Sequence, residues 1–107
     1  MPSEYELFPD LSSLFSEIPE DSIVSRTYYE DERQKYILFG FAPGQELSEH
    51  TASQPAVLQF LKGRATLLLG TDEHKANPGT WVHMDANLSH SVNAETEVLM
   101  LLVLYKA

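Results

Sequence analysis

The sequence predicts an all-β domain, a sandwich or barrel of short strands with one short helix before it. Runs of β-branched and aromatic residues begin at residue 22 and recur to the end of the chain. Turn residues interrupt these runs at close intervals, which is typical of sandwiches and barrels. The 107 residues, 43% of them hydrophobic, are enough for a single domain with its own core.

The one expected helix lies near the N-terminus. Asp10 follows Pro9 and can cap the segment LSSLFSEI, residues 11–18, in which apolar residues recur at helical spacing. Pro19 then ends the helix. Its expected role is to cover one end of the domain with its apolar face.

Strands are expected from residue 22 onward, separated by polar turns. The segment 56–70 fits either two strands that meet at Lys62 and Gly63 or one long bent strand. Residues 71–79 are polar and end in an Asn-Pro-Gly turn, so they are expected to form a loop. The remaining strands are expected at residues 22–30, 35–42, 80–85, 90–94 and 97–105.

The last of these strands is apolar at every position from Val98 to Tyr105. A strand of this kind should be shielded from water on both faces, because a wet apolar face invites aggregation. The interior of a single barrel covers only one face of this strand. The other face needs a second layer, which is either the opposite sheet with the helix or another subunit. We favour a homodimer in which sheet faces pack together.

The net charge of −9 is spread along the chain and repels phosphate backbones and anionic lipids. No nucleic-acid partner and no membrane partner is therefore expected. The opening MPSEYELFPD lacks the basic and apolar parts of a secretory signal. The absence of cysteine excludes disulfides and Cys-based zinc sites, and a cytoplasmic location is the default expectation.

Two spaced blocks carry the strongest functional signal. The first has gaps of five, one, three and six residues between Gly44, His50, Ala52, Ala56 and Gly63. The second has gaps of five, one and two residues between Gly79, Asp85, Asn87 and His90. These blocks resemble the paired motifs of the cupin superfamily. The residues within them are similar to those of small, single-domain "cupin 2, conserved barrel" (RmlC-like) proteins.

The resemblance runs from about Ile23 to Leu104 and implies a small double-stranded β-helix, the cupin or jelly-roll barrel. Residues 1–107 would form one cupin domain, with an N-terminal arm at about 1–21 and the barrel at 22–107. The resemblance does not identify one activity, since one fold hosts many functions.

The resemblance also implies metal ligands, of which this chain keeps two and loses two. His50 matches the first ligand and His90 the last, whereas Ala52 and Ala56 occupy the other two positions and have no lone pair to give. A divalent transition metal (zinc, nickel, manganese or iron) is therefore a possible cofactor with an incomplete site, because proteins usually supply at least three ligands. His83 is the best candidate for a third ligand.

Several structural interpretations compete with these functional ones. The two motif histidines could be neutral imidazoles that are hydrogen-bonded inside an apolar barrel. His83 fits an edge or interface position, and the sequence does not say which face of its strand looks inward. His74 fits a solvated loop position, and Trp81 fits core or dimer packing. A small-molecule pocket would be lined by the two motif histidines together with Phe60, Trp81 and Met84.

Three functions remain open from the sequence, and the first of them is favoured. The first is a barrel that binds a small molecule, with or without a weakly held metal. The second is a metal-dependent cupin enzyme, a dioxygenase or isomerase, that uses His50 and His90. The third is a structural protein whose barrel has become a packed core.

Overall fold

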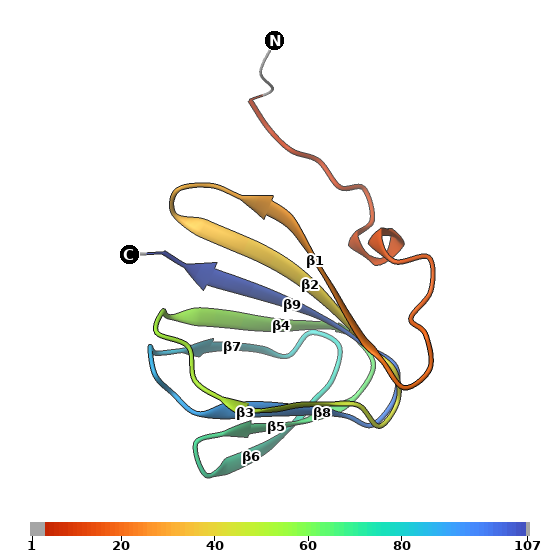
Figure 1. The fold of residues 1–107 in the computed structure, drawn as a ribbon, viewed down its shortest axis with the longest axis vertical. Helices are drawn as coiled ribbons and strands as arrows, with labels where there is room; N and C mark the ends of the chain where they lie inside the picture. The colour runs from red at the N-terminus through yellow and green to blue at the C-terminus, as the bar shows by residue number, and fades with distance from the viewer. Residues whose placement is uncertain (1–3, 107) are drawn as a thin grey trace.

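Two antiparallel sheets stacked face to face form the body of the protein (Figure 1). The structure is a computed structural model that describes residues 4–106. The larger sheet has the strand order β1-β2-β9-β4-β7 and the smaller sheet the order β3-β8-β5-β6. The elements are a 3-10 helix η1 (Leu11–Leu14) and the strands β1 (Ile23–Glu30), β2 (Gln34–Phe41), β3 (Glu46–His50), β4 (Ala56–Lys62), β5 (Ala65–Leu69), β6 (Asp72–Ala76), β7 (Trp81–Met84), β8 (His90–Ala94) and β9 (Val98–Tyr105).

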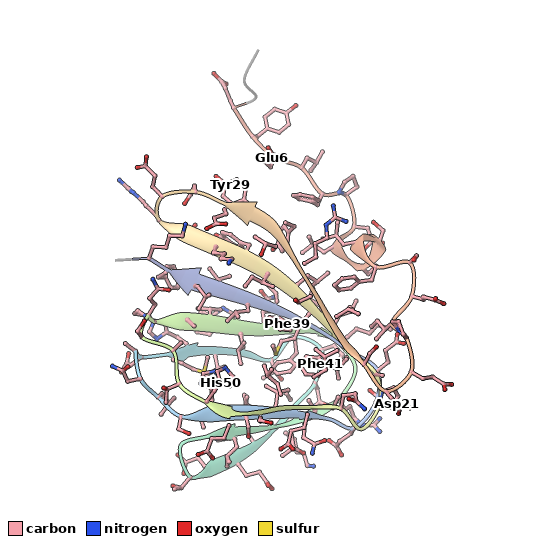
Figure 2. The ribbon with its side chains drawn as sticks, viewed as in Figure 1. Glu6, Asp21, Tyr29, Phe39, Phe41 and His50 are labelled. Carbon is pink, nitrogen blue, oxygen red and sulfur yellow. The ribbon has the colours of Figure 1, made fainter. Side chains whose placement is uncertain are left out.

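The predicted all-β jelly-roll class is confirmed, but the barrel is not closed. The strand ladders of residues 4–106 run within one sheet or the other, and none joins the two sheets. The layers are instead held together by side chains that meet between them, such as Phe39 and Phe41 of β2 (Figure 2). No helix in residues 4–106 is long and apolar enough to cross a membrane.

The core lies between the two inner faces. Alternation along β4 places Leu58 and Phe60 in the core, as predicted, and they are 2% and 0% exposed. The smaller sheet contributes short side chains from β5 and β8. The core cluster consists of Phe41, Ala56, Leu58, Phe60, Ala65, Leu67, Ala76, Met84, Val92, Ala94, Val98 and Met100.

The central strand β9 is buried on both faces over part of its length, as its sequence predicts. Val98 and Met100 point into the core, while Leu99 and Val103 on the other face are 5% and 6% exposed. The N-terminal segment supplies part of the outer cover, because Ile18 packs so closely on Gly40 of β2 that a Cβ there would lie 2.7 Å from its Cδ1 atom. The layer that covers the outer face of the larger sheet is therefore formed in part by the same chain.

The predicted helix is much shorter than expected. The Asp10 cap is present, with its carboxylate accepting from the Ser12 backbone N–H at 3.0 Å. The helix nevertheless ends at Leu14, and Phe15 already has extended dihedral angles. The prediction of a helix through Ile18 is wrong because the chain becomes extended at Phe15 and carries Ile18 onto Gly40 of β2.

The predicted loop at residues 71–79 is also wrong over its first half, where Asp72–Ala76 forms β6. Its first four residues are all exposed, so the strand shows no alternation of apolar and polar residues. Pairing with β5 stabilises it through backbone hydrogen bonds. The strand β3, which was not predicted, is similarly polar and exposed. Both are edge strands of the smaller sheet.

The segment 56–70 forms two strands, and these belong to different sheets. The chain crosses over at Gly63, whose φ of +85° lies in the left-handed region. A Cβ at this position would collide with the Glu97 carbonyl oxygen. Gly63 is thus required twice, by its dihedral angle and by the close approach of another backbone.

We expect Gly63→Ala to lower the free energy of unfolding by about 3 kcal/mol or more, because the backbone must shift as well as accept a strained φ. The matched control is Gly44→Ala, where φ is +82° but nothing lies within 4 Å. That change should cost only the dihedral strain, about 1–2 kcal/mol. Urea unfolding of both variants measures the difference, and equal losses would contradict this account of the crossover.

Candidate functional site

Two histidines that are distant in the sequence meet at one end of the smaller sheet. His50 is the last residue of β3 and His90 the first residue of β8, and the antiparallel pairing of these strands places them opposite each other. Their ring centroids are 4.2 Å apart, with an angle of 58° between the ring planes. The structure therefore brings together the two histidines that the motif spacing singled out.

The pair lies on the inner face of the smaller sheet. His90 is two and four positions before Val92 and Ala94, both core residues, so strand alternation turns it to the same side. Figure 2 shows the His50 side chain on the side of β3 that faces the larger sheet. His90 is only 6% exposed, whereas His50 is exposed. The pair thus lies at the boundary between the core, where His90 is buried, and solvent, to which His50 is exposed.

Each imidazole is oriented by a backbone carbonyl of its own strand or turn. His50 Nδ1 lies 2.8 Å from the Ser48 carbonyl oxygen, and His90 Nδ1 lies 2.9 Å from that of Leu88. A carbonyl can only accept, so each Nδ1 donates, and in the neutral ring Nε2 then carries the lone pair. The site consequently offers two acceptor or ligand nitrogens from adjacent rings.

The turns that follow β3 and precede β8 are tied to their surroundings. The Asn87 backbone N–H donates to the Ala52 carbonyl at 2.7 Å, which links the two turns. Gly70 N–H donates to the Ser89 carbonyl, also at 2.7 Å. Asn87 adopts a φ of 71°, a left-handed conformation that asparagine tolerates better than most residues. These bonds hold the two histidine-bearing strand ends in register.

The burial of His90 lowers its pKa below the ordinary value of 6.5 because the charged ring loses hydration. The hydrogen bond to the Leu88 carbonyl opposes this shift, and the nearby His50 adds a further lowering by charge repulsion. His90 is therefore neutral at pH 7, the form in which an imidazole binds a metal or accepts a hydrogen bond.

The residues of the site fit only half of a metal centre. The two Nε2 atoms have the right chemistry, and the carbonyl bonds at Nδ1 are those that orient metal-binding histidines. Ala52 and Ala56 add no donor, and the described residues 4–106 contain no group of three side chains that could hold a metal ion. Residues 4–106 by themselves therefore do not supply a complete coordination shell.

The third predicted ligand, His83, lies elsewhere. Val82 and Met84 pack with the core, so the alternate residues of β7 face outward, which decides the orientation that the sequence left open. His83 is exposed there, with its Nδ1 3.9 Å from the Asp85 carboxylate. The structure does not bring His83 together with the histidine pair.

The other predicted pocket residues are also divided between the two faces. Phe60 and Met84 are buried in the core, at 0% and 2% exposure, whereas Trp81 on the outer face is 58% exposed. Two surface pockets among residues 4–106 are lined by neither histidine of the pair. His90 is 6% exposed and His50 is exposed, so a ligand of this site would approach from the His50 side.

Sequence reasoning missed the carbonyls of Ser48 and Leu88, which orient the two rings. Both belong to the residue two positions before the histidine, and backbone groups leave no trace in residue identity. The cluster of tyrosines on the outer face was missed as well. Its signal was the repeated tyrosine at residues 28–29, which breaks the alternation of a strand.

Comparison with solved structures gives the fold family. A cupin superfamily protein from Desulfitobacterium hafniense has a TM-score of 0.85 and 23% identity, over 100% of this chain and 95% of that one. A conserved protein of unknown function from Streptococcus pyogenes has a TM-score of 0.83 and 25% identity, over 100% and 91% of the two chains. No protein-family model and no curated protein matches the sequence.

A third structure has the family name to which the two motifs were similar in sequence. A cupin 2 conserved barrel domain protein from Leptotrichia buccalis has a TM-score of 0.82 and 27% identity, over 90% of this chain and 46% of that one. The predicted resemblance to cupins is thus confirmed for the fold. These likenesses do not identify an activity, because this fold hosts many.

We expect an NMR titration to find the pKa of His90 below 6.5 and to find it raised in His50→Asn, which removes the repelling charge. At pH values between the folded pKa of His90 and 6.5, the unfolded chain then binds more protons at this residue than the folded chain does. Stability from this residue is therefore complete above pH 6.5 and is lost as the pH falls through the folded value. His90→Gln should lack this part of the pH dependence in urea unfolding. A normal pKa for His90 would contradict the burial argument.

Proposed function

The chain has the cupin fold, and we propose that it binds a small molecule at the mouth of the sandwich through His50 and His90. The observation that supports the proposal is the pair of rings 4.2 Å apart, each with Nδ1 engaged by a carbonyl and Nε2 left as an acceptor. Two adjacent lone pairs are best satisfied by one group that supplies donors to both. A ligand with neighbouring hydroxyl or amino groups meets this requirement.

The packing of the interior limits where the ligand sits. Phe41, Phe60 and Met84 are fully or almost fully buried and fill the space between the sheets. The ligand would therefore contact the exposed His50 first and reach the buried His90 at the edge of the core. The net charge of −9 favours a neutral or cationic ligand over an anion.

The second candidate is a metal-dependent enzyme of the cupin kind. The observation that favours it is the carbonyl bond at each Nδ1, which fixes the tautomer that a metal-binding histidine needs. Zinc, nickel, manganese or iron could be held by the two Nε2 atoms, with bound water or substrate completing the shell. A metal held by two side chains is held weakly, so simple ligand binding remains the first proposal.

We expect His50→Ala to abolish the binding of small polyols and amino alcohols in a thermal-shift screen without disturbing the fold, because His50 is exposed. His74→Ala, an exposed histidine on β6, is the matched control and should bind like the unchanged protein. Repeating the screen with EDTA separates the two candidates, since chelation removes binding only where a metal is required. Ligands that bind His50→Ala as well as the unchanged protein would refute the site.

Titration with Ni²⁺ and Zn²⁺ gives a second, independent measurement. If a metal is the intermediary, calorimetry should show one site per chain that is lost in both His50→Ala and His90→Ala and kept in His74→Ala. Its affinity should be micromolar or weaker, since only two side chains coordinate. Elemental analysis of protein purified without a metal-affinity tag shows which metal, if any, is carried at stoichiometric amount.

The proposal also includes a homodimer formed through the outer face of the larger sheet. A row of paired residues that are not fully buried crosses this face from Leu101 through Gln59 to Trp81. Trp81 ends the row with 58% of its surface exposed, so its indole is available for packing against a second chain. The cytoplasmic location stays a prediction that rests on the absence of cysteine.

We expect sedimentation equilibrium to give twice the chain mass for the unchanged protein and the single mass for Trp81→Glu, because the variant would bury an unpaired charge in the interface. Glu73→Gln, on the exposed face of β6, is the control and should leave the mass unchanged. A monomeric unchanged protein would refute the dimer without affecting the proposed ligand site.

A further inference from the structure

An open pocket lies on the outer face of the larger sheet, the face opposite to the one that meets the histidine pair. It has a volume of about 280 Å³ and lies where the N-terminal segment passes β1 and β2. Figure 2 shows Glu6 on that segment above the part of β1 that carries Tyr29. The pocket, called the tyrosine cage below, is lined by Glu6, Phe8, Tyr28, Tyr29 and Tyr36.

A β-bulge builds the cage. Thr27 pairs with Ile37 and Tyr29 pairs with Tyr36, which leaves Tyr28 as an extra residue in β1. In a regular strand, two consecutive tyrosines would point to opposite faces. The inserted residue returns the second tyrosine to the outer face, and bulges re-aim side chains in this way next to functional sites. Both tyrosines consequently line the same pocket as Tyr36.

The four aromatic rings surround the pocket instead of stacking flat on one another. Phe8 lies edge-on to Tyr28, with centroids 5.2 Å apart and an angle of 79°. Tyr36 lies 6.0 Å from Tyr28 and 5.7 Å from Tyr29, with angles of 55° and 69°. All four rings are half-buried, so each keeps part of its surface for a ligand. Inclined rings present π-faces in several directions around one space.

Two carboxylates, those of Glu6 and Asp31, act on the cage. Glu6 lines the pocket and has no ion-pair partner among residues 4–106. The Tyr29 hydroxyl donates to the Asp31 carboxylate at 3.1 Å, and this bond, with the charges of Asp31 and Glu6, raises the pKa of Tyr29. The nearby Lys106 is engaged by Glu30 at 2.7 Å and by the Asp31 carbonyl. Glu6 is thus the charged side chain that lines the pocket itself.

We infer that the tyrosine cage binds a small molecule through a quaternary or alkyl ammonium group. The aromatic faces attract a cation through their quadrupoles, and this attraction is strongest for ammonium groups that carry alkyl rather than strongly hydrated surfaces. Glu6 adds a charge partner at the rim. The site is separate from the histidine pair in residues, in face and in ligand chemistry, so it does not depend on the ligand site proposed at that pair.

Other occupants fit the same surface less well. An anion would be repelled by the Glu6 carboxylate and by the net charge of −9 on the chain. A neutral aromatic group could pack on the rings, but it would leave the Glu6 carboxylate without a role. A strongly hydrated inorganic cation would gain little from rings that cannot replace its water. A ligand that combines apolar surface with positive charge uses every part of the cage.

The test compares choline with 3,3-dimethyl-1-butanol, which has the same shape but carries carbon in place of the charged nitrogen. The full chain is titrated with each probe, and the tyrosine ring signals are followed by NMR. We expect the dissociation constant of choline to be at least tenfold lower, because only choline has the charge that the rings and Glu6 attract. The indole signal of Trp81, at the opposite edge of the sheet, should not move.

Paired variants identify the parts of the cage. Tyr29→Leu should weaken choline binding about fivefold or more, whereas Tyr29→Phe, which keeps the ring, should bind like the unchanged protein. Glu6→Gln should weaken choline severalfold and reduce the salt dependence of binding. Its matched control is Glu4→Gln, an exposed change on the same segment outside the pocket. Glu6 is itself exposed, so its variant remains informative even if a tyrosine variant fails to fold.

Three results would overturn the inference. Equal affinities for choline and its neutral analogue would mean that the rings offer only apolar surface. The absence of any saturable shift with choline would mean that the cage binds no such cation. A change in sedimentation mass with Tyr29→Leu, without an effect of choline on the cage signals, would mean that a second copy of the chain covers this surface.

Discussion

The larger sheet depends on β9, a strand that is apolar on both faces and lies at the centre of five strands. Such a strand requires two layers of cover, and the smaller sheet provides only one of them. The inner layer forms the core around Met100, while the outer layer begins with Ile18 and the N-terminal segment. Both candidate sites lie where these two layers end, because there the side chains change from packed to exposed.

The histidine pair is a consequence of strand pairing and not of proximity in the sequence. The register of β3 against β8 places His50 opposite His90, and the two-residue period turns His90 to the same side as Val92. Backbone carbonyls then set both rings. With alanine at positions 52 and 56, the remaining chemistry is that of two acceptors, which is sufficient for a polar ligand and marginal for a metal.

The sequence predicted those features of the fold and the site that depend on the pattern of apolar residues and on motif spacing. It predicted seven of the strands and the inward direction of Leu58 and Phe60, because buried faces impose a period of two. It missed β3 and β6, whose exposed side chains carry no such period, since backbone pairing alone makes them strands. The orientation of His83 was likewise open, because a four-residue strand has two equivalent readings until its partner is known.

The two sites use the two-residue period in opposite ways. His90 remains in phase with the core residues of its strand, so its ring is tied to the packing of the interior and is costly to move. The tyrosine cage requires the period to be broken once, at Tyr28, and a bulge sacrifices regular pairing. The loss is smallest on an edge strand such as β1, where one side is unpaired and irregularity also discourages aggregation through that edge. An edge is thus the place where this fold can acquire a second site without disturbing the first.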